Sequence, residues 1–204
     1  MLKRKVMLNW LFSAANGWVA LVALAVLLGS TWVLGRNNPK EEIIQKLGDA
    51  YVSTDSDFLY DPAKAEKMFL LYKARPDEEQ RELFAAHRRF LTFHDRIYPL
   101  CYAVPLVLLL AYFYPPLPPG EGRRFGLLVL LPLLAMIFDY AENQTILSVL
   151  GSVEATGQVP LQALGRARIF TAVKIGLLGA SLLLLLGFAA CAQGRRLREL
   201  VGRS

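Results

Sequence analysis

Five polar side chains lie within or beside long apolar stretches of this sequence, where an ionisable group is costly and usually marks function. They are Asp95, Asp139, Glu142, Asn143 and Lys174. Asp139, Glu142 and Asn143 have the i, i+3, i+4 spacing that places three residues on one face of a helix. Two carboxylates and an amide in a low-dielectric setting need a cation, and Lys174 is the candidate. The pattern therefore predicts a buried polar cluster.

Chain direction supports a pairing between Glu142 and Lys174. Each lies about 7–8 Å from the same end of neighbouring apolar stretches, because a helix rises about 1.5 Å per residue. The cluster can be a structural ion-pair network that fixes how helices pack. It can also be a functional pocket in which one carboxylate exchanges a proton or acts as an acid or base. A third reading is that the apolar stretches end earlier and leave these groups in water.

Four further residues could line the same pocket, namely His94, Tyr98, Tyr102 and Arg168. Interfacial anchoring would explain the two tyrosines equally well. The two histidines of the chain, His87 and His94, are seven residues apart on one expected helix, which separates them by about 10.5 Å. That separation is too large for one ion, so we expect no metal site and no cofactor.

The elements that must position these residues are four apolar stretches in a chain that is 54% hydrophobic. They cover residues 10–34, 97–114, 125–147 and 169–190, approximately. About 20 apolar residues cross the hydrocarbon core of a bilayer as a helix. We therefore expect an all-α protein, with residues 1–204 forming a single transmembrane domain built on a four-helix bundle.

Residues 36–96 form a long insertion after the first stretch, and we expect it to be helical. Asn38-Pro39, Asp61-Pro62 and Pro76-Asp77 each combine a capping residue with proline, as helix starts do. In the third of these helices, apolar residues recur at helical spacing as far as Ile97, where the second span begins. The insertion is thus predicted to form a small helical extracytoplasmic cap.

Basic residues gather in three short segments, at residues 3–5, at 123–124 and in the C-terminal tail, with nine Lys/Arg in all. Spans orient with such flanks on the cytoplasmic side. The insertion carries 11 Lys/Arg against 12 Asp/Glu and is nearly neutral. Hence we expect a multi-pass protein of the cell membrane with cytoplasmic N and C termini. The formal net charge of +6 is explained by these flanks, so nucleic acid is not an expected partner.

Three segments together resemble a family of small, uncharacterised bacterial four-pass membrane proteins. The segments are Asp95-Arg-Ile-Tyr-Pro-Leu-Cys-Tyr102, Phe138-Asp-Tyr-Ala-Glu-Asn143 and Phe170-Thr-Ala-Val-Lys174. They match the patterns D-x-x-[FY]-P-x-x-Y and D-x-x-E-N and a lysine early in the last span. The resemblance implies the four-pass architecture, a shared polar cluster and location in a bacterial inner membrane. It implies no activity.

Three classes of function fit these observations. The expected one is a lipid-binding or accessory membrane protein, whose partner is a membrane lipid, a hydrophobic small ligand or another membrane protein. One alternative is an intramembrane enzyme that acts on a lipid-like substrate, with Asp139 or Glu142 as acid or base and Lys174 as electrostatic partner. The other is a proton- or ion-coupled transporter.

Overall fold

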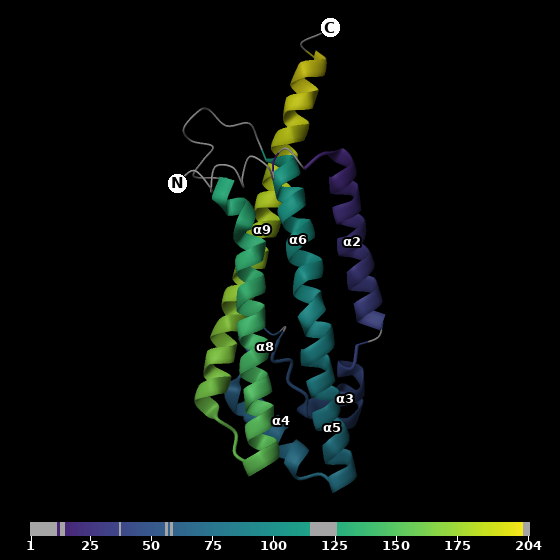
Figure 1. The fold of residues 1–204 in the computed structure, drawn as a ribbon. Helices are drawn as coiled ribbons and strands as arrows, with labels where there is room; N and C mark the ends of the chain where they lie inside the picture. The colour runs from purple at the N-terminus through teal and green to yellow at the C-terminus, as the bar shows by residue number, and fades with distance from the viewer. Residues whose placement is uncertain are drawn as a thin grey trace. The chain divides into compact units, whose positions relative to one another are not determined.

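A computed structural model shows an all-α protein, as the sequence predicts (Figure 1). The structure describes residues 12, 15–36, 38–55, 57, 59–114 and 126–201, without the side chains of 195–201. Helices are found at α2 (Gly17–Arg36), α3 (Lys40–Leu47), η1 (Gly48–Ala50), α4 (Pro62–Lys73), α5 (Asp77–Arg89), η2 (Phe90–His94), α6 (Asp95–Phe113), η3 (Gly126–Leu130), α8 (Leu131–Thr156) and α9 (Leu161–Val201). The described residues contain no strand.

Four helical segments are long and apolar enough to cross a membrane by length and composition. They are Gly17–Arg36, Asp77–Phe113, Gly126–Thr156 and Leu161–Gly194. Large apolar side chains on α2 and α9 are exposed, with Trp18 at 80% and Leu183 at 71%. Monomeric soluble proteins rarely expose apolar surface on this scale. These observations support a membrane protein. The span starts expected at Trp10 and Phe125 lie outside the described residues, as do the basic flanks at 3–5 and 123–124.

The chain divides into two compact units, and each long helix contributes a part to both. Unit 1 is Met1–Ser30, Cys101–Leu134 and Gly176–Ser204, and unit 2 is Thr31–Leu100 and Ala135–Ile175. In unit 1, Leu110 of α6 is buried with Val129, against Leu184 and Phe188 of α9. Small residues Ala20 and Ala23 of α2 pack against Leu109, because a short side chain lets two helices approach closely.

Unit 2 holds the larger core and all of the insertion. Phe69 and Tyr72 of α4 and Leu83 of α5 are completely or almost completely buried, together with Leu150 of α8 and Leu164 of α9. Burying a Leu or Phe side chain stabilises a fold by about 1.5–3 kcal/mol. The insertion is therefore not a loose linker, because its helices share one core with parts of the long helices.

Local sequence signals explain where the helices of unit 2 begin and end. The Asp61 side chain accepts a hydrogen bond from the Ala63 amide at 2.9 Å, with Pro62 in the first turn of α4, as predicted. The α8 helix ends at Gly157, whose φ of 70° a residue with a side chain rarely adopts. Gly48, with φ 54° and ψ −128°, ends α3 in another backbone conformation that residues with a side chain rarely adopt.

The predicted passage from α5 into the second span is interrupted by a wider turn. Phe90–His94 form a π-helix, in which the Asp95 amide donates to the Phe90 carbonyl five residues earlier. Such a turn contains one residue more than an α-helical turn, and it frequently occurs at functional sites. The periodic helical stripe expected from the sequence is therefore displaced by one residue from Asp95 onward.

Candidate functional site

Lys174 of α9 lies at the centre of a buried ionic triad with Asp139 and Glu142 of α8. Its Nζ lies 3.0 Å from Asp139 Oδ1 and 2.7 Å from Glu142 Oε2. It also donates a hydrogen bond of 2.8 Å to the backbone carbonyl of Asp55. An ammonium group has three N–H donors, so these three oxygens can satisfy all of them. The side chains of the triad are at most 7% exposed.

Asp55 belongs to the segment between η1 and α4, and it carries a second ion pair. Its carboxylate binds Lys40 of α3, and it accepts a hydrogen bond from Ser53 Oγ at 3.1 Å. The Lys40 ammonium also lies 4.4 Å from the centre of the Phe90 ring, a cation–π contact. Burial alone would raise the pKa of Asp55, but the charge of Lys40 and its hydrogen bond hold that pKa below its usual value. Asp55 is therefore an ionised carboxylate.

Asp95 and Asn143 join α6 to α8 through a different kind of contact. The Asn143 side-chain amide donates to the Asp95 backbone carbonyl at 2.9 Å. The Asp95 side chain is buried, and its Oδ2 has no hydrogen-bond partner among the described residues. The same holds for Asn143 Oδ1, Glu142 Oε1 and His94 Nδ1. A buried polar atom without a partner typically costs about 1–3 kcal/mol, so these atoms need a role.

Counting charges shows that acids exceed bases in this part of unit 2. The carboxyl groups are Asp55, Asp95, Asp139 and Glu142, and the ammonium groups that contact them in the described structure are Lys40 and Lys174. Uncompensated charges are strongly disfavoured in a low-dielectric interior, and such groups take up protons or bind cations instead. We define these six side chains as the ionic cluster. Asp95, which no described ion pair includes, is therefore the member of the cluster that favours a proton or a further cation.

A cavity of about 270 Å³ opens beside the ionic cluster within unit 2. One part of its wall is apolar or small, with Leu34, Gly35 and Phe90. The remaining lining residues are polar, and they are Thr31, Asn38, Lys40, Asp55, His94, Asp95 and Tyr98. The π-helix contributes Phe90 and His94 to this wall, and Asp95 follows it directly. The wider turn thus belongs to the cavity. The triad of Lys174, Asp139 and Glu142 does not line it.

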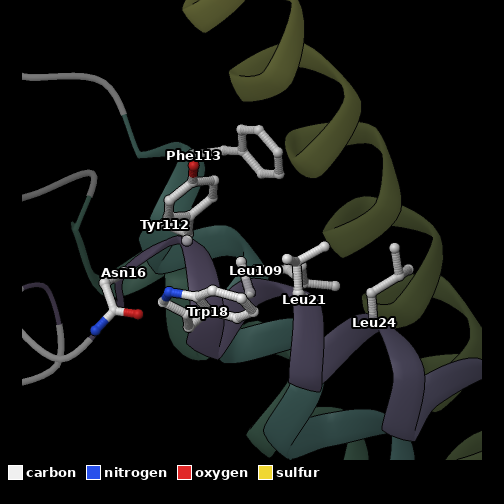
Figure 2. Close-up of a pocket in the computed structure, with 9 residues that line it drawn as sticks. Asn16, Trp18, Leu21, Leu24, Leu109, Tyr112 and Phe113 are labelled. Carbon is white, nitrogen blue, oxygen red and sulfur yellow. The ribbon is translucent and has the colours of Figure 1, made fainter.

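Unit 1 contains a second and larger cavity, of about 530 Å³, between the start of α2 and the end of α6 (Figure 2). Figure 2 shows its apolar lining, in which Trp18, Leu21 and Leu24 of α2 lie near Leu109 and Phe113 of α6. None of the described residues in this lining is an acid, a lysine, an arginine or a histidine. Acid–base or ion-binding chemistry is therefore concentrated in the cavity of unit 2.

Seven of the nine residues singled out by the sequence fall into three groups. Asp139, Glu142 and Lys174 are in direct contact, Asn143 is joined to the backbone of Asp95, and His94 and Tyr98 line the unit 2 cavity with Asp95. Tyr102 belongs to unit 1 and is buried there.

Arg168 is half-buried in unit 2, where its charge acts on Tyr60. Burial, together with the charge of Glu142, raises the pKa of Tyr60, and Arg168 opposes that shift. The Tyr60 hydroxyl donates to the Leu164 carbonyl at 2.8 Å, which ties the insertion to α9. Arg168 is not among the described ion pairs of the cluster.

Sequence reasoning missed Lys40 and Asp55, which complete the ionic cluster. Both come from the insertion, where charged residues are frequent and no periodic pattern distinguishes these two. His87, by contrast, is a core residue, whose Nδ1 lies 3.1 Å from the Tyr72 hydroxyl and whose ring stacks on Phe69. Among the described residues, no group of three or more His, Cys, Asp or Glu side chains is arranged to hold a metal ion.

Comparisons of the chain with protein-family models, with curated proteins and with solved structures return no match. The class of protein therefore follows from the fold and the site alone. It is an all-α protein with four helical segments that can cross a membrane, and it contains an acid-rich ionic cluster beside a cavity. The resemblance to a bacterial four-pass family stays a prediction.

Proposed function

We propose that this chain binds an amphiphilic, lipid-like molecule in the cavity of unit 2. The observation that carries the proposal is the divided lining of that cavity, which is apolar at Leu34 and Phe90 and ionic at Lys40, Asp55 and Asp95. Ligand sites are mostly apolar with a few convergent polar groups. Asp95 Oδ2 and His94 Nδ1, which lack partners among the described residues, are the groups that a polar head would satisfy.

The position of the cavity supports a ligand with an apolar tail. Its walls come in part from α2 and from the segment Asp77–Phe113, which are both long and apolar enough to cross a membrane. A headgroup held by the polar wall can leave its tail beside these helices, in contact with surrounding lipid. A purely polar ligand would gain nothing from the apolar wall.

The ionic triad has a structural role in this proposal. Lys174, Asp139 and Glu142 do not line the cavity, and the contacts of Lys174 connect α9, α8 and the segment that contains Asp55. A buried and hydrogen-bonded charge network of this kind fixes one packing arrangement, because any alternative leaves a charge without a partner. This role requires no chemistry from Asp139 or Glu142.

The proposal places the protein in the cell membrane with cytoplasmic N and C termini. The basic segments at 3–5, at 123–124 and in the C-terminal tail support this orientation, because such segments favour the cytoplasmic side. The insertion, and with it the cavity, would then face the extracytoplasmic side. Its partner would be a lipid of that side of the membrane.

Two glycines of α2 provide the test. Gly35 lines the cavity, whereas Gly29 lines neither described cavity, and a Cβ at either position would meet no atom within 4 Å. Gly35→Leu should occupy cavity volume, and Gly29→Leu makes the same change elsewhere on the helix. Leucine is about 0.8–1 kcal/mol better than glycine in a helix, so both variants should fold.

The measurement is native mass spectrometry of the full chain, released from membranes in a mild detergent. We expect an amphiphile bound to the wild-type protein and to Gly29→Leu, and at least tenfold lower occupancy in Gly35→Leu. Equal occupancy in the two variants would refute the cavity as the binding site. A wild-type protein that carries no amphiphile would refute the proposal as a whole.

A further inference from the structure

Among the carboxyl groups of the ionic cluster, Asp95 is distinguished by its lack of a cation. Asp55 contacts Lys40, whereas Asp139 and Glu142 both contact Lys174. No ion pair with Asp95 occurs in the described part of the chain. The residue is only 6% exposed, its Oδ2 has no hydrogen-bond partner there, and it lines the unit 2 cavity. A positive group would therefore fit beside Asp95.

From this geometry we infer that the cavity recognises an ammonium-type head, and that this head takes the place of a proton on Asp95. The inference rests on the proposed function and specifies its ligand as a cationic amphiphile. An ammonium group donates N–H bonds to a carboxylate, and such charge-assisted hydrogen bonds are about twice as strong as neutral ones. The head would supply the donor that Oδ2 lacks and a positive charge that the cluster lacks.

An anionic head fits this cavity poorly. The cation on its wall, Lys40, is already paired with Asp55 and lies over the Phe90 ring. A phosphate or carboxylate head would have to displace Asp55 from Lys40, and the displaced Asp55 carboxylate would then lie beside the bound anion without its cation. Like charges held together in an interior disfavour each other strongly. The lining therefore discriminates between heads by the sign of their charge.

The replacement of the Asp95 proton by an ammonium head follows from the environment of Asp95 in the empty cavity. The charged and titratable groups around it come from α3, the segment before α4, the π-helix, α6, α8 and α9. They are Lys40, Tyr51, Asp55, His94, Tyr98, Asp139 and Lys174. The nearby lysines are engaged by other carboxylates, so a bare Asp95 carboxylate would be buried without compensation. Asp95 is therefore a neutral carboxylic acid when the cavity is empty.

Binding then transfers one proton out of the site. The O–H bond of the Asp95 carboxylic acid breaks, its proton passes to water, and the carboxylate accepts a hydrogen bond from the incoming ammonium group. The charge of the site is unchanged, because one cation replaces another. Since one proton is released for each head bound, the affinity should rise about tenfold for each unit of pH while Asp95 is protonated in the empty state.

The experiment uses three amphiphiles with the same alkyl chain: dodecylamine, dodecanol and dodecyl phosphate. Their binding to the full chain in neutral maltoside micelles is measured between pH 5 and pH 8, and the binding that Gly35→Leu abolishes is taken as specific. We expect dodecylamine to bind at least tenfold more tightly than the other two, with the stated dependence on pH. In Asp95→Asn, both the preference and the pH dependence should disappear.

Asp57→Asn is the matched control, since it removes an exposed acid from the same segment as Asp55 and should leave binding unchanged. Asp95→Asn should fold, because asparagine resembles the neutral acid in shape. The inference is overturned if dodecanol or dodecyl phosphate binds as tightly as dodecylamine, or if dodecylamine binding is independent of pH. If none of the three shows binding that Gly35→Leu abolishes, the proposed function itself fails.

Discussion

Removing the Lys174 ammonium should destabilise the protein more than removing either carboxylate of the triad. Lys174→Met deletes three contacts at once, those with Asp139, Glu142 and the Asp55 carbonyl. It also leaves the four acids of the ionic cluster with Lys40 as their remaining described cation. Breaking a buried ion pair from one side typically costs about 3–5 kcal/mol, so we expect a loss of that size in the free energy of unfolding.

Removing one carboxylate has the opposite effect on the charge balance. Asp139→Asn loses a hydrogen bond to a charged group, which typically contributes about 1.5–3 kcal/mol. It also reduces the excess of acids over lysines, which offsets part of that loss. The double variant Lys174→Met/Asp139→Asn should therefore be more stable than Lys174→Met alone. For neighbouring residues of one network, the coupling free energy is typically about 0.5–3 kcal/mol.

The assay is reversible unfolding of the full chain in mixed micelles of dodecyl maltoside and increasing SDS, followed by far-UV circular dichroism. Arg88→Met is the control, because Arg88 and Glu154 form an ion pair whose side chains are about half exposed, and such pairs contribute about 0–1 kcal/mol. The reasoning is wrong if Lys174→Met costs no more than Asp139→Asn. It is also wrong if the double variant is no more stable than Lys174→Met.

Three further predictions concern unit 2. The pKa of Asp55 is lower in the folded protein than its usual value of about 3.9. The ionised Asp55 therefore contributes its full stabilisation above about pH 3.9, and this contribution is lost as the pH falls towards the pKa of the folded state. Thermal unfolding between pH 5 and pH 3 should show the loss, and Asp55→Asn should reduce it. Tyr72→Phe should lower the free energy of unfolding by about 1–3 kcal/mol, because it leaves a buried nitrogen of His87 without its partner; an unchanged SDS midpoint would contradict this. Deleting the exposed Thr92 should turn the π-helix into α-helix and leave Asp95 near its present direction, because a π-turn contains one residue more than an α-turn. We therefore expect stability and ligand occupancy close to those of the wild type, and a loss of occupancy in a folded variant would show that the wider turn itself shapes the cavity.

The fold was predictable because its signals are local or periodic. Long apolar stretches predict helices that can cross a membrane, and the all-α fold is confirmed. The start of α4 at Asp61-Pro62 follows from capping chemistry, which involves residues two apart. The Glu142–Lys174 contact was anticipated for a similar reason, since chain direction and helical rise place two residues at one depth without any knowledge of side-chain packing.

Lys40, Asp55 and the π-helix depend on information that is absent from local sequence. Asp55 lies between helices, where no periodicity applies, and its two lysine contacts are 15 and 119 residues away along the chain. The π-helix replaces a continuous α-helix over Phe90–His94, a segment of ordinary helix-compatible composition. Tertiary packing decides both features. Sequence reasoning therefore located the triad but not the cavity beside it.

Asp55 connects these two parts of the candidate site through different atoms. Its backbone carbonyl accepts from Lys174 of the triad, whereas its side chain binds Lys40 and lines the cavity. The segment around it is held in place independently, because Thr171 of α9 donates to the Thr54 carbonyl at 3.1 Å. A headgroup that engages the cavity would thus meet a carboxylate whose backbone is anchored in advance. Such preorganisation favours binding, since little conformational freedom is left to lose when the ligand arrives.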